Sequence, residues 1–321
     1  KIMNEFKIIN NYFKALSRKN PAAKNLNDDV FFDKKRGIVI SVDTYNSNIH
    51  FKDFIYPQLI IKKIIRSSLS DLICKGVTPK FYFLSGSGNK TTFTKKNLSL
   101  ISKSLKEEQK KYSIKIGGGD TVYSKIPSFT VTVVGFSNKI VNRNNAKNND
   151  DIYVTGNLGD NLLGLKFLKN KIRSSKKSKK YFVNKYYCPE IPFLFSKKLT
   201  YFANSSIDIS DGLISDMEKL INNQKLYFEI NINKIPISKK LNDYLQKNNK
   251  DKKDFVFSGD DYQILFTSSK KNRGTIKSIS KKTNQKVTII GSINNNLKKN
   301  MLIQDNKSLK LAKFRGYSHK F

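Results

Sequence analysis

The stretch that decides the fold is residues 57–84, PQLIIKKIIRSSLSDLICKGVTPKFYFL. Between Pro57 and Lys75 the apolar residues recur at helical spacing, which predicts an α-helix. Gly76 stands where this pattern stops, as expected of a residue that ends a helix. The apolar run from Phe81 to Leu84 then predicts a strand. A helix followed by a strand indicates a domain that mixes both kinds of element.

The rest of the first half continues this mixed pattern. A short amphipathic helix is predicted in the first ten residues and a second one over 94–111. The predicted strands are 30–32, 37–42, 113–116 and 129–136, and the last of them is rich in Val and Thr. The strand 113–116 is expected to end in the run Gly117-Gly118-Gly119-Asp120.

A polar, turn-rich segment over 138–149 marks the best domain boundary. The mixture of elements restarts after it. The expected elements are strands 151–156, 206–210, 227–232, 264–267 and 287–290, a helix over 160–169, and a helix that begins near Asp211 or Leu213. The sequence therefore predicts an α+β (α/β mixed) protein with two domains, 1–138 and 139–321.

The charge of the chain raises the question of nucleic-acid binding. Its 321 residues include 61 Lys and Arg against 25 Asp and Glu, a formal net charge of +36. A basic surface binds phosphate backbones, but here the lysines are scattered over almost every segment and no nucleic-acid motif accompanies them. Their densest cluster, within 166–185, favours a solvated face. Specific nucleic-acid binding is therefore not expected.

Cysteines and apolar segments bear on the location of the protein. Cys74 and Cys188 lie far apart and form no metal or disulfide pattern, which indicates a reducing compartment. No apolar run reaches the roughly 18–20 residues of a membrane helix, and the first residues lack the apolar core of a signal peptide. We expect a cytoplasmic protein that does not bind membranes.

The aspartates carry the chemical signal against this basic background. Most stand beside Gly, Ser or Thr at predicted strand ends and turns, where small neighbours let a ligand approach the backbone. They are Asp28, Asp29, Asp43, Asp71, Asp120, Asp208, Asp211, Asp260 and Asp261. Any one of them suits helix capping or a turn equally well. Their repetition favours several Mg²⁺ ions bound to a polyphosphate, because Mg²⁺ prefers oxygen ligands.

Phosphoryl transfer fits such a set of residues. Metals with Lys or Arg neutralise charge on the transferred group. An acceptor that is itself a phosphate ester, with a second pKa of about 6, needs no strong general base. The lack of a catalytic His or Cys pattern is therefore no obstacle.

Two short motifs suggest phosphate contacts. Gly117–Thr121 is expected to follow a strand and to cradle phosphate with its backbone N–H groups, although it is not a Walker sequence. Residues 208–212, Asp-Ile-Ser-Asp-Gly, run from a strand into a helix, so Asp208, Ser210 and the helix-start amides would converge on a phosphate or a metal. Helix capping by Ser210 or Asp211 is the alternative, and both readings are compatible.

Taken in order, these segments resemble the thiamine-monophosphate kinase family, within the ATP-binding proteins related to aminoimidazole ribonucleotide synthetase. Asn27–Val30 resembles the family's Gly-Asp-Asp-Ala element, and Ser41–Thr44 with Ile49–Phe51 resembles its Ser-Thr-Asp-Thr and His-Phe elements. Residues 69–79 are similar to its helix motif Ser-Asp-Leu-Ala-Ala-Met-Gly-Ala-x-Pro, and Gly118–Thr121 to its nucleotide and metal loop. Further similar segments are Tyr153–Gly156, Leu158–Asp160, Ile207–Leu213, Gly259–Tyr262 and Gly316–His319.

This resemblance implies a fold and a reaction. The fold is that of aminoimidazole ribonucleotide synthetase, with an N-terminal domain that pairs with its twin through a sheet, a C-terminal α+β domain, and ATP in a cleft near the interface of the homodimer. The reaction is direct in-line transfer of the ATP γ-phosphoryl group to the phosphate of thiamine monophosphate. It gives thiamine diphosphate, in the biosynthesis of that cofactor, without a phosphoenzyme.

The resemblance also implies roles for individual residues. The Mg²⁺ ligands are Asp29, Ser41, Val42 through its backbone, Asp43, Asp71, Asp120, Asp208 and Asp211. Asp120 and Asp208 are the most critical of them, and no residue acts as an acid or a base. The ATP contacts are Gly119, Asp120, Arg143 and Ser210. Thiamine monophosphate contacts His50, Asp260 and Tyr317, the last as a stacking partner of the thiamine ring.

Three positions depart from the family pattern. Asn27 replaces Gly, Val42 replaces Thr and so removes a hydroxyl, and Asp260 replaces Glu and is shorter by one methylene. These changes predict altered affinity on an intact carboxylate framework. Apart from the resemblance, His50 suits an ordinary strand end and Tyr317 a packing contact equally well.

Two alternative functions stay open at this level. One is another ATP-dependent enzyme of the same superfamily, such as a selenophosphate synthetase, the cyclo-ligase of purine synthesis or a hydrogenase maturation factor. The other is a non-catalytic nucleic-acid-binding protein that keeps the fold.

Overall fold

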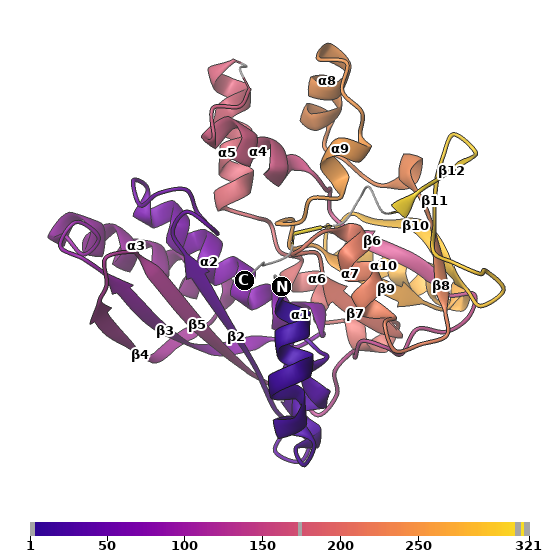
Figure 1. Cartoon of the computed structure of the whole chain (residues 1–321), viewed down its shortest axis with the longest axis horizontal. Helices are drawn as coiled ribbons and strands as arrows, with labels where there is room; N and C mark the ends of the chain where they lie inside the picture. Colours follow the sequence, from indigo (N-terminus) through magenta and orange to yellow (C-terminus); the bar gives the residue numbers. More distant parts are fainter. Residues whose placement is uncertain (1–3, 173–174, 312–315, 318–321) are drawn as a thin grey trace.

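The computed structural model describes residues 4–172, 175–311 and 316–317 and contains two β-sheets (Figure 1). The first sheet has the strand order β1-β2-β5-β3-β4 and is antiparallel except for the pair β3 and β4. Its strands are β1 (Phe31–Asp33), β2 (Ile38–Asn46), β3 (Pro79–Gly88), β4 (Lys115–Tyr123) and β5 (Ser128–Phe136). The helices α2 (Pro57–Cys74) and α3 (Lys95–Tyr112) cover one face of this sheet (Figure 1).

The second sheet has the order β12-β11-β8-β10-β6-β9-β7. Its strands are β6 (Asp151–Thr155), β7 (Ser205–Asp208), β8 (Tyr227–Asn231), β9 (Ile264–Ser268), β10 (Val287–Asn294), β11 (Met301–Gln304) and β12 (Lys307–Leu309). The helices of this half are α4 (Asp160–Leu168), α5 (Lys176–Tyr187), α6 (Phe193–Ser196), α7 (Leu213–Leu220), α8 (Lys239–Lys247), α9 (Lys253–Val256) and α10 (Arg273–Lys282). Short 3₁₀ turns lie at Pro21–Leu26, Leu199–Tyr201, Ile232–Lys234 and Lys270–Asn272.

These elements confirm the predicted mixed α+β fold. Strands of the first sheet end at Phe136 and those of the second begin at Asp151, on either side of the polar segment. The domain boundary at residues 138 and 139 stays a prediction. Within the described ranges, none of the helices combines the length and apolar character needed to cross a membrane.

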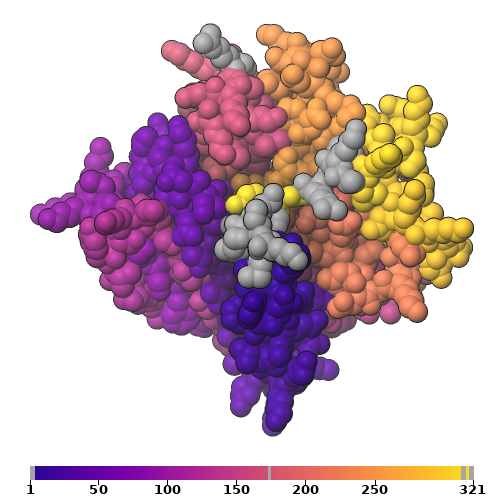
Figure 2. Space-filling model, in the orientation of Figure 1, coloured from indigo at the N-terminus to yellow at the C-terminus, as the bar shows by residue number. Residues whose placement is uncertain are grey.

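The N-terminal helical segment is longer than predicted. α1 (Glu5–Ile8) continues into a π-helical turn (Ile9–Phe13) and a 3₁₀ turn (Lys14–Ser17). Its aromatic side chains remain exposed, and Figure 2 shows the segment in indigo on the surface, between the two halves of the molecule. The helix predicted from the apolar spacing is therefore present, but the apolar face that an amphipathic helix would bury is not buried here.

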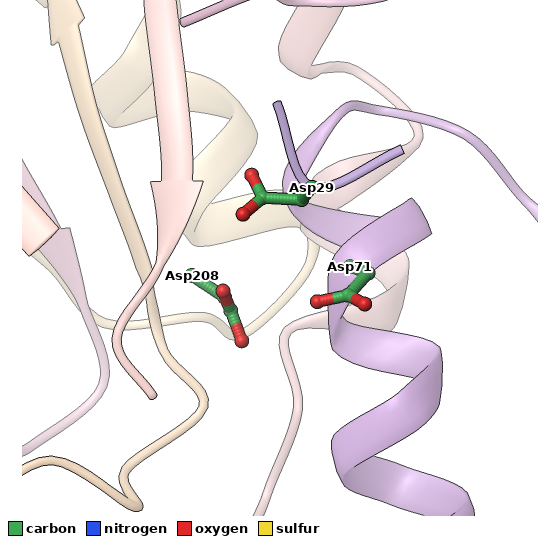
Figure 3. A group of neighbouring side chains, drawn as sticks. All are labelled: Asp29, Asp71 and Asp208. Atoms are coloured by element: carbon green, nitrogen blue, oxygen red, sulfur yellow. The ribbon is translucent and has the colours of Figure 1, made fainter. Parts of the chain in front are cut away.

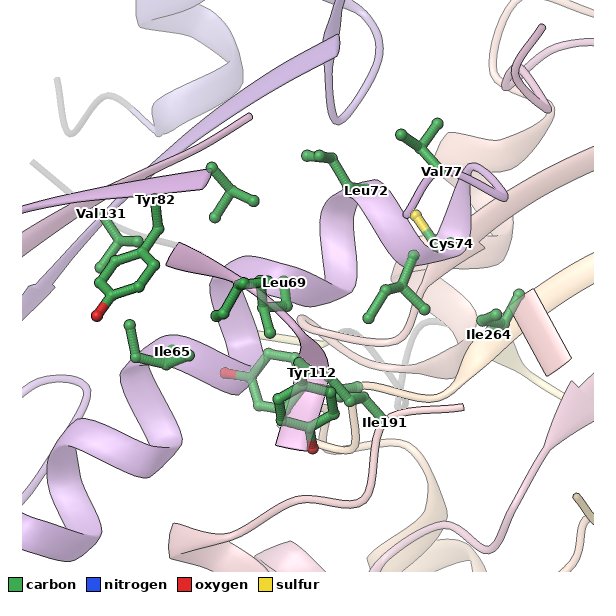
Figure 4. Packing of buried hydrophobic residues seen from close by; sticks show 14 of the residues in the cluster. Ile65, Leu69, Leu72, Cys74, Val77, Tyr82, Tyr112, Val131, Ile191 and Ile264 are labelled. Atoms are coloured by element: carbon green, nitrogen blue, oxygen red, sulfur yellow. The ribbon is translucent and has the colours of Figure 1, made fainter. Parts of the chain in front are cut away.

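Helix α2 organises the larger core cluster (Figure 4). It packs against β2 and β5 of the first sheet and also against α5 and β7 of the second half. The same cluster includes Val131 of β5 and Ile264 of β9, so it joins the two sheets. Because α2 is enclosed on several sides, even Lys63 and Arg66 are buried on it.

The glycine-rich run corrects the sequence prediction. β4 does not end before the glycines but continues through them to Tyr123, paired with β3. The register shifts around Gly117, and Gly118 has a φ of +155°, which favours glycine. A Cβ on Gly119 would lie 1.9 Å from the backbone oxygen of Leu84. The run is thus a bulged edge strand and not a loop.

One face of the first sheet carries no helix of the described chain (Figure 1). Its exposed apolar side chains include Val42, Phe81, Phe83 and Phe136, with exposed fractions of 60%, 39%, 41% and 53%. The sheet register places these residues on the same side, since paired residues share a face. We call this surface the open face.

The glycine run gives a test of the fold. We expect Gly119→Ala to lower the free energy of unfolding by about 1–3 kcal/mol, because the new methyl group overlaps the backbone of β3. Gly274→Ala is the matched control, since nothing lies within 4 Å of its Cβ position in α10. It should be neutral or slightly stabilising. Urea denaturation of both variants measures the difference, and equal stabilities would contradict the assigned pairing of β3 and β4.

Candidate active site

Three aspartates from separate parts of the chain meet where the two sheets join (Figure 3). Asp29 precedes β1, Asp71 lies on α2, and Asp208 ends β7. One carboxylate oxygen of each lies within 4.8 Å of the others. Figure 3 shows the three side chains pointing toward a common space. The structure therefore brings together residues that are up to 179 positions apart, since 208 − 29 = 179.

Burial raises the pKa of the carboxyl groups in this region. It raises the pKa of Asp43 and of Asp208 to about 6. Burial is also the largest cause of the raised pKa of Asp71, and the negative charges of Asp43 and Asp208 add to it. Ser70 Oγ donates a hydrogen bond of 2.6 Å to Asp208, and Tyr45 Oη donates one of 3.1 Å to Asp43. Buried carboxylates of this kind attract cations strongly.

Asp29 forms ion pairs with two basic side chains of the chain itself, Lys75 and Arg143. Lys75 Nζ lies 2.5 Å from Asp29 and 2.8 Å from Asp28. Arg143 donates to Asp29 from its guanidinium group and to Asp28 from its backbone N–H. Arg143, predicted as an ATP contact in the polar interdomain stretch, is therefore a partly buried ion-pair partner of a predicted metal ligand. The charges of Asp28 and other partners outweigh burial and raise the pKa of Lys75.

The segment 208–212 also differs from its prediction. The backbone N–H groups of Ser210, Asp211 and Gly212 all donate to one carboxylate oxygen of Asp216, at 3.1, 3.1 and 2.9 Å. They are thus not free to bind a phosphate, and neither Ser210 nor Asp211 caps α7. Lys219 Nζ neutralises this loop, at 2.5 Å from Asp211 and 2.8 Å from Asp216. Asp216 holds the loop from inside the helix.

We call Asp29, Asp71 and Asp208 the acidic group. A cavity of about 620 Å³ is lined by this group and by the predicted substrate contacts. The predicted site residues that line it are Asp29, Val42, Asp43, His50, Asp71, Asp208, Ser210, Asp211, Asp260 and Tyr317. Ser41, Gly119, Asp120 and Arg143 are not among its lining residues. Most of the predicted site residues thus share one space.

Asp260, a predicted substrate contact that lines the cavity, belongs to a charged pair. Asp260 accepts from Lys63 Nζ at 2.7 Å and from Tyr262 Oη at 2.7 Å. Lys63 is 2% exposed, and its ammonium group lies 3.5 Å from the ring centroid of Tyr186. Lys63 therefore occupies both the carboxylate of Asp260 and the aromatic face of Tyr186 in this structure. His50 Nδ1 accepts from the backbone N–H of Asn46 at 2.9 Å, which fixes the ring on the wall of the same cavity.

Asp120 lies away from this cavity within one chain. In the sheet register Asp120 pairs with Ser85, Ser85 with Thr130, and Thr130 with Thr44. Three strand spacings of ~4.8 Å place Asp120 roughly 14 Å from Thr44. Successive residues of a strand point to opposite faces, so Asp120 shares the open face with Thr44, whereas Asp43 points toward α2. The sheet therefore separates Asp120 from the other predicted ligands.

The residues present fit magnesium. The acidic group offers hard oxygen ligands from several elements, as Mg²⁺ requires. Ser41 Oγ lies beside Asp71 and is buried, without a well-oriented hydrogen-bond partner among the described residues. An orphaned hydroxyl beside buried carboxylates suits an ion or its bound water. Val42 is exposed on the open face and has only its backbone to offer.

Sequence reasoning missed the residues that balance and shape the site. These are Tyr45, Lys63, Lys75, Tyr186, Asp216 and Lys219. A weak signal was present for Lys75, which follows Asp71 by four residues at the end of the predicted helix. The abundance of lysine elsewhere hid it. Ser318 and His319 of the closing motif lie outside the described residues.

Comparisons with known proteins agree with this geometry. The family model described as AIR synthase related protein, N-terminal domain, matches residues 26–137. A thiamine-monophosphate kinase from Buchnera aphidicola subsp. Schizaphis graminum is 36% identical over 332 aligned positions, covering 98% of each chain. The thiamine-monophosphate kinase of Escherichia coli K12 is 28% identical, again over 98% of each chain.

Solved structures of other proteins share this fold. The structure of AaThiL complexed with AMPPCP and TMP has a TM-score of 0.85 at 25% identity and covers 98% of this chain and 97% of that one. The hydrogenase maturation protein HypE in complex with ATP has a TM-score of 0.66 at 12% identity and covers 95% of this chain and 93% of that one, which shows a shared fold alone.

Asp261 provides a test of the motif 259–262. It is 3% exposed and accepts from the Gly159 N–H at 3.1 and 3.3 Å, and burial raises the pKa of Asp261 well above its usual range. The folded state thus binds more protons than the unfolded state, and stability is lost as the pH rises from about 4 through the folded pKa. We expect Asp261→Asn, which keeps an acceptor, to be about 1–3 kcal/mol more stable than the unaltered chain at pH 8.

Thermal or urea unfolding between pH 4 and pH 8 measures this effect. The advantage of Asp261→Asn should shrink toward pH 4, where the carboxyl group is protonated in both states. Asp243→Asn, on the exposed side of α8, is the matched control and should show no such trend. A loss of stability at pH 8 in Asp261→Asn would show that the carboxylate charge is required.

Proposed function

The chain belongs to the thiamine-monophosphate kinase family, and from this premise we propose that it uses ATP to phosphorylate thiamine monophosphate to thiamine diphosphate. The observation that carries the proposal is that the acidic group of Asp29, Asp71 and Asp208 lines the same cavity as Asp260 and Tyr317. The acidic group suits a metal-bound polyphosphate. The ring of Tyr317 suits an aromatic organic cation, the chemical character of thiamine.

The chain's own residues have distinct tasks in this proposal. Asp43, Asp71 and Asp208 hold Mg²⁺, with Ser41 and the Val42 backbone beside them. Bound Mg²⁺ supplies positive charge that stabilises the transferred phosphoryl group. His50 and Asp260 orient the acceptor, whose phosphate is already largely ionised at neutral pH, with a second pKa of about 6. No general base is then required.

Arg143 supports ATP binding through a change of partner. Its side chain is partly buried, and its guanidinium group is paired with Asp29. A planar guanidinium binds phosphate oxygens as well as carboxylate oxygens. We therefore propose that Arg143 turns from Asp29 to the ATP phosphates when the nucleotide binds. Ser210, on the cavity wall, completes the contact.

A homodimer explains the open face and the position of Asp120. Val42, Phe81 and Phe83 give the first sheet an apolar surface that a second copy of the sheet would cover. Asp120 lies on the edge strand of the same surface. We propose that Gly119 and Asp120 of one protomer complete the ATP and metal site of the other.

The reaction itself gives the first test. We expect purified protein to form thiamine diphosphate from thiamine monophosphate only with ATP and Mg²⁺. Asp208→Asn should reduce the rate by roughly two orders of magnitude, because several kcal/mol of metal-dependent stabilisation are lost and each 1.36 kcal/mol is tenfold in rate. Asp243→Asn, exposed on α8, should retain the rate. A protein that binds ATP but forms no product would contradict the proposed acceptor.

Mixed dimers test the role of Asp120. Asp120→Asn and Asp208→Asn homodimers should both be nearly inactive. A dimer with one chain of each kind should recover about half of the normal activity, because one of its two sites then contains both native aspartates. Differently tagged, co-expressed chains allow purification of the mixed dimer. If the mixed dimer is as inactive as the homodimers, Asp120 serves its own chain.

A further inference from the structure

Lys75 is the most completely buried cation beside the acidic group. It follows the last residue of α2 and is 0% exposed. Its ammonium group contacts Asp28 at 2.8 Å, Asp29 at 2.5 Å and the backbone oxygen of Ser206 at 2.8 Å. An ammonium group has three N–H donors, and these three acceptors use all of them. Lys75 is therefore fixed in place, unlike a surface lysine.

The acidic residues fall into two kinds because of such contacts. Asp29 is paired with Lys75 and Arg143, and Asp211 with Lys219. Asp71 and Asp208 form no ion pair within the ranges that the structure describes. The chain thus supplies its own cations to Asp29 and Asp211 and leaves Asp71 and Asp208 for an external cation.

The ammonium group of Lys75 contacts the carboxylates of Asp28 and Asp29 and would repel a metal ion bound to either of them. Lys75 lies within hydrogen-bond distance of one oxygen of Asp29, so a divalent ion bound to that carboxylate would stand a few ångströms from the ammonium charge. Water does not screen this repulsion, since Lys75 is fully buried. Arg143 differs, because its guanidinium group is not tied to a third acceptor in the described structure and has a proposed alternative partner.

We propose that Lys75 is a built-in cation of the metal site, which takes the place of a divalent ion at Asp29 and limits how many ions the nucleotide-free chain binds. This inference rests on the proposed magnesium site. In the absence of ATP, metal binds at Asp43, Asp71 and Asp208, and Asp29 contributes little. Lys75 is a positioning residue, since it acts on the metal through Asp29 and touches neither substrate.

Metal binding by Lys75→Met tests this directly, because Met has a similar length and no charge. Mn²⁺ is the probe. The electron paramagnetic resonance signal of unbound Mn²⁺, followed during a titration without any substrate, gives the number of bound ions and their affinity. We expect Lys75→Met to bind one more ion per chain than the unaltered protein, or to bind Mn²⁺ at least tenfold more tightly. Its melting temperature should also rise more on addition of MgCl₂. Equal ion numbers and affinities would overturn the proposal.

Lys63→Met is the matched control, since it also removes a buried ammonium group paired with an aspartate, Asp260. It should leave Mn²⁺ binding at the acidic group unchanged, and an equal gain in both variants would mean a general charge effect and overturn the proposal. A second pair of variants keeps the test open if Lys75→Met does not fold. Asp29→Asn should barely change Mn²⁺ binding, whereas Asp71→Asn should weaken it at least tenfold. Equal losses in these two variants would refute a neutralised Asp29.

These measurements separate the inference from the proposed function. Mn²⁺ binding involves neither thiamine monophosphate nor ATP, so a failure to form thiamine diphosphate leaves the binding result unchanged. Conversely, an active enzyme with equal ion numbers in the two proteins would retain the function and remove the role of Lys75.

Discussion

The burial of like charges at the junction of the two sheets is the constraint on which this structure depends. Burial raises the pKa of Asp43, Asp71 and Asp208, which shows how strongly the ionised forms are disfavoured without a cation. A fold that held these groups together only by packing would lose stability as they ionise. The ion pairs of Asp29 with Lys75 and of Asp211 with Lys219 reduce the number of charges left to balance.

Helix α2 connects this electrostatic problem to the architecture. One side of the helix packs on the first sheet, and the other side contacts α5 and β7 of the second half. The apolar residues of α2 that form the core, such as Leu69 and Leu72, thereby hold Asp71 and Lys75 at the junction. Asp71, a proposed metal ligand, and Lys75 are thus held in place by the packing of the core, which suits a reaction that depends on positioning.

The order of elements and the identity of most aspartates were predictable from sequence, because helical spacing, glycine punctuation and turn residues are local signals. What was not predictable depends on contacts between distant residues. The helix-start amides after Asp208 are predicted to face a phosphate or a metal, but those of residues 210–212 all donate to Asp216. The glycine run is expected to be a loop, but it pairs with β3 as a bulged strand, so close to Leu84 that only glycine fits at position 119.

Charge was the least predictable property, for a compositional reason. Lysines are so numerous in this chain that the sequence alone does not distinguish Lys63 and Lys75 from the rest. Both are among the best-buried side chains of the structure. A lysine that replaces a neutral surface residue changes little, whereas a buried lysine must be matched by fixed acceptors. The two kinds are indistinguishable by composition and separate only when their partners are known. In this chain the partners of Lys63 and Lys75 are aspartates that line the cavity, so residues proposed to bind substrate and metal also carry part of the stability of the fold.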